Sequence, residues 1–174
     1  MANSVFLDGS EQQLSVGFEA GANIVGTAAA ETLFVEDDAS VSFTPQSGDR
    51  VGVGPNLDSY TITRTGLTSL ELSNEETGQT VTFTVNQGEE FELRFGDGGT
   101  TVNLVVPDDG NSVINIGGAE LAQGEQANLE NIALDPDKPS TVGDAAGPNF
   151  TLSENANIVD EGETLTFTVE TDEA

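Results

Sequence analysis

Short runs in which every second residue is apolar recur along this chain, and they constrain its fold more than any other feature. In residues 91–95, Phe-Glu-Leu-Arg-Phe, an extended strand would place the three apolar side chains on one face and the two charged ones on the other. A period of two residues is typical of half-buried strands. The same pattern is seen in residues 14–18, 41–43, 60–63, 70–72, 81–85, 102–106 and 113–116.

Turn-forming residues separate these runs at intervals of about ten residues. Examples are Gly96-Asp97-Gly98-Gly99 and Pro107-Asp108-Asp109-Gly110, which combine the residue types that favour tight turns. Strands joined so closely predict hairpins. The expected fold class is therefore all-β, an antiparallel β-sandwich or β-roll with short hairpins. Ala119–Leu129 is the longest candidate for a helix.

The composition shifts near Leu134 and divides the chain into three parts. Residues 1–134 form the expected β-rich module, and residues 135–149, rich in Pro, Asp and Gly, are predicted to be a linker. Residues 150–174 hold two further strand patterns. Two strands cannot hold a core alone, so this C-terminal strand segment must pack back on the module, begin a further domain or serve as a donor strand to another chain.

Negative charge dominates the composition. Thirty-one Asp and Glu residues face only four cations, Arg50, Arg64, Arg94 and Lys138, and the formal net charge is −27. Such a chain repels nucleic acid and anionic membrane surfaces, and it has no apolar run long enough for membrane insertion. Self-repulsion would be relieved by divalent cations or by a partner. The three arginines lie in or beside strand patterns and are expected to pair with acidic residues on neighbouring strands.

The residue types on which most enzymes depend are missing. The sequence has no His, no Cys and no Trp, and one Tyr. The commonest general base, thiolate chemistry and the aromatic lining of a glycosidase cleft are therefore absent. We expect a protein that is not an enzyme. A glycan-binding module remains the alternative, and it would need Tyr60 or a Phe side chain exposed on a concave face.

Several turns carry acidic residues beside Gly or Pro, a pattern that suits calcium, which takes six to eight oxygen ligands. For each turn the competing interpretation is an Asx turn or a solvated loop. The pairs Asp108-Asp109 and Asp135-Asp137 are the strongest candidates because a proline stiffens each loop. The full set of predicted metal ligands is Asp97, Asp108, Asp109, Asp135, Asp137, Asp160, Glu161 and Glu163.

Two parts of the sequence resemble known families. Residues 26–33, Gly-Thr-Ala-Ala-Ala-Glu-Thr-Leu, together with residues 57–64 and 95–98, resemble modules of large RTX-type bacterial proteins, and this resemblance covers about residues 20–122. Residues 150–169, with Glu161-Gly162-Glu163 before a strand pattern, resemble the opening of a Calx-β-like repeat. The tandem nonapeptides that bind calcium in RTX β-rolls are not present, so those sites are not carried over.

These resemblances imply a type-I-secreted, extracellular location and calcium as the cofactor. With the composition, they lead us to expect a structural or adhesive module of a bacterial surface layer or biofilm matrix. Its expected partners are further copies of itself, in head-to-tail contact by strand addition through residues 5–7 or 164–170, or neighbouring modules of one chain. The alternative is the glycan-binding module of a secreted protein.

Overall fold

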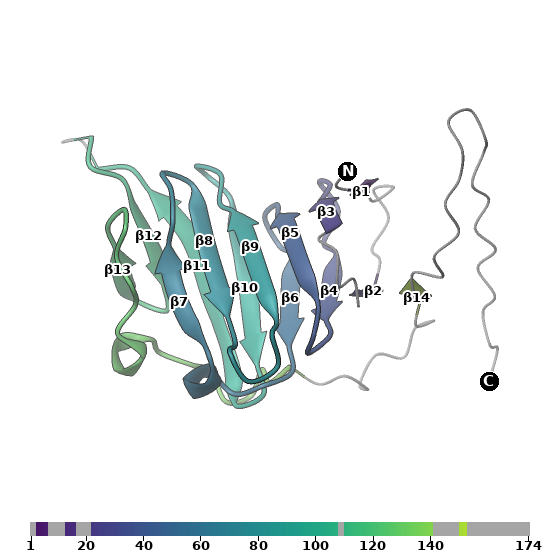
Figure 1. The fold of residues 1–174 in the computed structure, drawn as a ribbon. Coiled ribbons are helices and arrows are strands. Elements are labelled where there is room, and N and C mark those ends of the chain that lie inside the picture. Colours follow the sequence, from purple (N-terminus) through teal and green to yellow (C-terminus); the bar gives the residue numbers. More distant parts are fainter. Residues whose placement is uncertain (1–2, 7–12, 17–21, 108–109, 141–149, 153–174) are drawn as a thin grey trace.

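Fourteen short strands in two sheets make up the part of the chain that the computed structural model describes, residues 3–6, 13–16, 22–107, 110–140 and 150–152 (Figure 1). In spatial order, the first sheet contains β1 (Asn3–Phe6), β3 (Ala22–Val25), β5 (Ser40–Thr44), β9 (Thr80–Thr84), β8 (Ser69–Ser73) and β7 (Thr61–Arg64). The second contains β13 (Ala119–Leu121), β12 (Val113–Ile116), β11 (Gly98–Val105), β10 (Glu90–Phe95), β6 (Arg50–Val53), β4 (Thr32–Val35), β2 (Gln13–Val16) and β14 (Phe150–Leu152). The predicted all-β sandwich is confirmed.

The first six strands form a coil that alternates between the sheets. β1, β3 and β5 pair in parallel in one sheet, and β2, β4 and β6 pair in parallel in the other. Thr32 pairs with Arg50, eighteen residues later, and Ala22 pairs with Val41, nineteen residues later. A parallel pair needs a long crossover, and here each crossover contains a strand of the opposite sheet. The predicted antiparallel pairing is therefore not found among these six strands, which pair with one another in parallel.

The following strands form the antiparallel hairpins that the turns predict. β7, β8 and β9 make a meander that joins the first sheet beside β5, and β10 to β13 make a second meander beside β6. The helix predicted at Ala119–Leu129 is wrong. Its first residues form β13, and two glycines with positive φ, Gly118 and Gly124, flank them. Short 3-10 turns occur at Leu57–Ser59 and Leu129–Asn131.

The described part of the predicted linker, residues 135–140, contacts the module. Asp135 pairs with Gly99 in an isolated bridge, and the Ser140 N–H donates to the Phe95 carbonyl at 2.6 Å. β14 pairs in parallel with β2. Residues 141–149 and 153–174 lie outside the described residues, so the linker boundary and the donor strand at 164–170 stay predictions.

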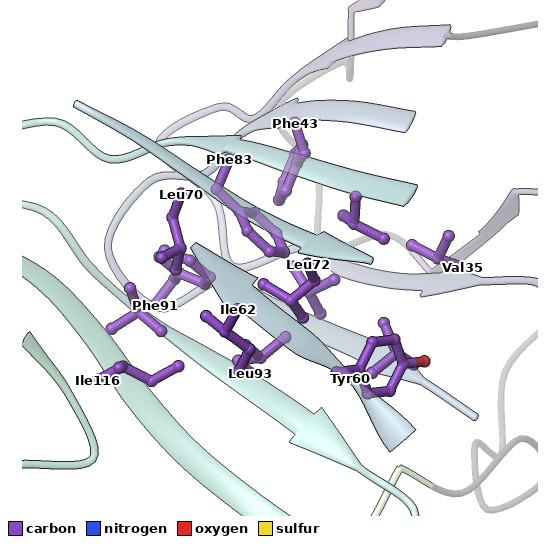
Figure 2. Packing of buried hydrophobic residues seen from close by; sticks show 14 of the residues in the cluster. Val35, Phe43, Tyr60, Ile62, Leu70, Leu72, Phe83, Phe91, Leu93 and Ile116 are labelled. Carbon is purple, nitrogen blue, oxygen red and sulfur yellow. The ribbon is translucent and has the colours of Figure 1, made fainter. Parts of the chain in front are cut away.

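The alternation of apolar residues places one face of each sheet in a shared core. In β10, Phe91, Leu93 and Phe95 are buried, as their spacing predicts. Phe83 of β9 packs across the sheet interface against Phe91, with 5.0 Å between ring centroids (Figure 2). Aromatic pairs at this separation add to the free energy gained by burying their area.

Arg64 is the one cation inside the core, and none of the described acidic residues forms the ion pair with it that we predicted. It follows Ile62 by two residues and so lies on the buried face of β7, with no exposed surface. Its guanidinium donates to the carbonyls of Gly66, Leu67, Ser112 and Leu121 and to the Ser112 hydroxyl. Burial lowers its pKa. One side chain thereby ties the β7–β8 turn to Ser112, which precedes β12, and to Leu121, the last residue of β13.

Replacing Phe83 with Ala should lower the free energy of unfolding by about 3–5 kcal/mol, because it removes a buried ring and leaves a cavity between the sheets. Leu67, which is 65% exposed, provides the control, and Leu67→Ala should change stability by less than about 0.5 kcal/mol. Urea unfolding followed by circular dichroism measures both. Equal effects of the two substitutions would contradict the packing described.

Candidate functional site

The structure describes three of the predicted calcium ligands, Asp97, Asp135 and Asp137, and the carboxylates of the first two accept hydrogen bonds from backbone N–H groups. Asp97 Oδ1 accepts a hydrogen bond from the Leu57 N–H at 3.0 Å and so joins the β10–β11 turn to the 3-10 turn at Leu57–Ser59. Asp135 Oδ1 accepts from the Asp137 N–H at 3.1 Å, which is an Asx turn. Among the described residues, no three His, Cys, Asp or Glu side chains gather as a metal site would require. Calcium binding by these three residues stays a prediction.

The other predicted ligands, Asp108, Asp109, Asp160, Glu161 and Glu163, lie outside the described residues. Their role in metal binding stays a prediction.

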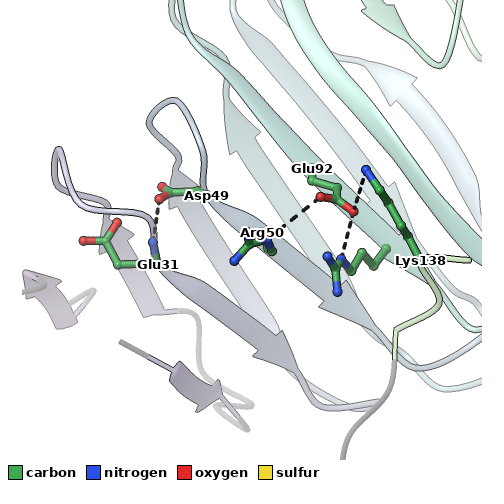
Figure 3. A network of polar contacts seen from close by, with 6 residues as sticks. Glu31, Asp49, Arg50, Glu92 and Lys138 are labelled. Atoms are coloured by element: carbon green, nitrogen blue, oxygen red, sulfur yellow. Dashed lines mark hydrogen bonds and ion pairs between the residues drawn. The ribbon is translucent and has the colours of Figure 1, made fainter. Parts of the chain in front are cut away.

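A pair of buried carboxyl groups lies where the coil passes from one turn to the next. Glu31 precedes β4 and Asp49 precedes β6, and they are 1% and 0% exposed. Asp49 Oδ1 accepts from the Glu31 N–H at 3.0 Å (Figure 3). Its Oδ2 accepts from the Gln46 N–H at 2.8 Å. The Glu31 carboxylate accepts from the N–H and hydroxyl of Thr27. A side chain at Gly26 would meet Asp49 Oδ2, since an added Cβ would lie 2.6 Å away.

Burial raises the pKa of Asp49 from 3.8 to about 6. Its two backbone hydrogen bonds oppose the shift, while the hydrogen bond and negative charge of the Glu31 side chain add to it. Sequence reasoning missed this pair. The available signal was a repeated pattern in which an acid precedes core residues by two and four positions. Glu31 precedes Leu33 and Val35, and Asp49 precedes Val51 and Val53, at an offset of eighteen residues.

A second polar site lies on the outer face of the second sheet, opposite the core. Glu92 of β10 is surrounded by three cations: Arg94 Nε lies 3.0 Å from its Oε1, Lys138 Nζ 3.7 Å from the same oxygen, and Arg50 Nε 4.0 Å from Oε2 (Figure 3). We call these four residues the Glu92 cluster. The expected cross-strand pairing is confirmed for Arg50, whereas Arg94 pairs with Glu92 two residues away on its own strand. All three cations share one carboxylate, so the cluster has an excess positive charge of two.

Strand register and a covering segment position the cluster. Glu92 pairs with Arg50 across β10 and β6, which places both side chains on the outer face. Lys138 comes from the segment that runs over β11, where its N–H donates to the Asp135 carbonyl. Gly99 lets this segment lie close, since a Cβ there would be 2.8 Å from the Lys138 carbonyl. A pocket of about 400 Å³ opens between the segment and the sheet, lined by Glu92, Lys138, Asp135, Thr100 and Thr101 among others.

The aromatic face that a glycan-binding module would need is not provided by Tyr60. This side chain is 3% exposed, packs against Phe95 with 5.6 Å between ring centroids, and donates its hydroxyl hydrogen to Gln79. Burial raises its pKa. Its ring serves the core.

No protein-family model, curated protein or solved structure matches this chain. The described residues include no helix of the length and apolar character needed to cross a bilayer.

Asp49→Asn should remove part of the pH dependence of stability. Because the folded-state pKa of Asp49 is raised, the folded protein binds this proton more tightly than the unfolded chain does. The wild type should therefore lose up to about 3 kcal/mol of unfolding free energy from this group as pH rises from about 4 to about 6.5. The Asn variant should lack that loss, whereas the exposed Asp58→Asn should retain it. Chemical denaturation at half-unit pH steps measures the difference, and parallel curves for wild type and Asp49→Asn would refute the assignment.

Proposed function

We propose that this chain is a structural module of an extracellular bacterial surface layer or biofilm matrix, which self-associates and is stabilised by calcium. The observation that carries the proposal is the unequal protection of the edges of the first sheet. An edge strand with unpaired backbone groups can accept a strand from another chain.

One edge of the first sheet is covered. The Arg64 N–H of β7 donates to the Glu125 carbonyl, and the Ala127 N–H donates to the Ile62 carbonyl, so residues 125–127 lie along that strand. At the opposite edge, no described residue pairs with the outer side of β1. Addition of a strand there, from another copy or an adjoining module, would continue the parallel stack of β1, β3 and β5.

Charge supports the extracellular, calcium-dependent part of the proposal. A chain of net charge −27 associates with itself only when counter-ions reduce the repulsion, and divalent cations do so more strongly than sodium at equal concentration. Calcium binds the acidic turns predicted from the sequence, such as Asp108-Asp109, which lie outside the described residues. The interior of the sandwich is filled by side chains of the core, which suits a structural role.

Calcium should raise both the melting temperature and the molar mass of the protein. At a concentration one hundred times the dissociation constant, one bound ion contributes about 2.7 kcal/mol, which corresponds to a rise of roughly 5–10 °C for a chain of this size. Differential scanning calorimetry and multi-angle light scattering in calcium, in EDTA and in sodium chloride of equal ionic strength measure the two effects. A monomer of unchanged melting temperature in all three solutions would contradict the proposal.

A further inference from the structure

From the charge distribution we infer that the Glu92 cluster is the surface that receives carboxylates from a second copy of this chain. The inference rests on the proposed self-association and specifies which surface makes the contact.

All the accessible side-chain cations of the chain lie in this cluster. The sequence has four cations, and the fourth, Arg64, has no exposed surface. Outside the cluster the sequence holds thirty acidic residues and only Arg64 to oppose them. Any contact between two copies that avoids the cluster therefore brings carboxylates against carboxylates. A contact that includes it is the one for which charge is complementary.

The cluster is both positioned and accessible. The side chains of Arg50 and Lys138 are each 46% exposed and that of Arg94 is 26% exposed, whereas that of Glu92 is 17% exposed. Two of the cations are on paired strands, and Lys138 is held by the bridge between Asp135 and Gly99. The single carboxylate of Glu92 cannot neutralise three cations, and arginine can bind a further carboxylate through two parallel hydrogen bonds. The adjoining pocket of about 400 Å³ offers space for incoming acidic side chains.

In the head-to-tail form of this contact, each copy presents its cluster to one neighbour and an acidic patch to the other. The receiving surface is cationic and the surface that it binds is acidic, so the two patches differ. Such a heterologous contact leaves one cluster and one acidic patch open on each pair, and further copies can add at both ends. If the cluster served only its internal ion pairs, each would contribute less than about 1 kcal/mol to folding and none to association.

Two double variants of equal charge test the inference. Arg50→Gln with Lys138→Gln dismantles the cluster, and Gln87→Glu with Gln123→Glu adds two negative charges at exposed positions away from it. Each carries a net charge two units more negative than wild type. In sedimentation measurements with calcium, the first should weaken association at least about tenfold and the second less than about threefold. Glu92→Gln should strengthen association, since it leaves three cations with no internal carboxylate.

Lys138 is the only lysine, which allows the contact to be mapped chemically. A carbodiimide, which couples an amine directly to a carboxylate, should cross-link Lys138 to Glu92 within one copy. As the protein concentration rises, it should also cross-link Lys138 to an Asp or Glu of a second copy. Mixing ¹⁵N-labelled and unlabelled protein identifies the second product by mass spectrometry, and Glu92→Gln should increase its yield.

The outcomes separate the two proposals. If the wild type associates, the two double variants associate equally and Lys138 forms no product between copies, then the cluster is not the contact although self-association stands. If the wild type stays monomeric at every concentration and calcium level, both proposals fail. Cluster-dependent binding of a polygalacturonate oligomer by a protein that stays monomeric would also overturn the assignment, because the occupant would then be a glycan.

Discussion

The contact between the apolar faces of the two sheets has to hold this molecule together against the mutual repulsion of thirty-one acidic residues. Packing such as that of Phe83 against Phe91 does so by removing ring surface from water. Because the core takes one face of every strand, charged side chains are left to the outer faces and the turns. The negative charges therefore lie at the surface, where ions and partner molecules can reduce their repulsion. This arrangement lets a chain of such acidic composition fold.

The few polar groups that do enter the interior connect the coil to the hairpins. Arg64 donates only to carbonyls and a hydroxyl, and it secures the β7–β8 turn to Ser112, which precedes β12, and to Leu121, the last residue of β13. Asp49 and Glu31 link successive turns of the parallel coil through backbone N–H groups. A buried polar group without a hydrogen-bond partner would destabilise the fold. Each of these groups is therefore accompanied by a local feature that supplies its partners, such as Gly26, whose lack of a side chain leaves room for the Asp49 carboxylate.

How far the sequence predicts this structure depends on strand length and on the distance to the partner strand. β8, β9, β10 and β12 alternate cleanly and pair with neighbours along the chain, and they were predictable. β3, β4 and β6 have four residues each, and Gly52 interrupts the alternation of β6. Their parallel partners lie eighteen or nineteen residues away, beyond the reach of turn chemistry. The sequence of an acidic turn does not reveal whether its carboxylate binds an ion or accepts a hydrogen bond from the backbone. The carboxylates of Asp97 and Asp135, two of the predicted metal ligands, each accept a hydrogen bond from a backbone N–H. The Glu92 cluster depends on strand register and on Lys138, forty-six residues further along the chain, so local patterns could not indicate it.

Among the described residues, the first sheet has one covered edge and one open edge, and the accessible cations form one patch in an acidic surface. The molecule therefore has different surfaces to offer to the copies on either side. The most direct test of this account is electron microscopy of the protein assembled in calcium. The account predicts polar chains in which the Glu92 cluster of each copy meets acidic residues of the next. Two-fold symmetric pairs with the cluster facing solvent, or isolated monomers, would contradict it.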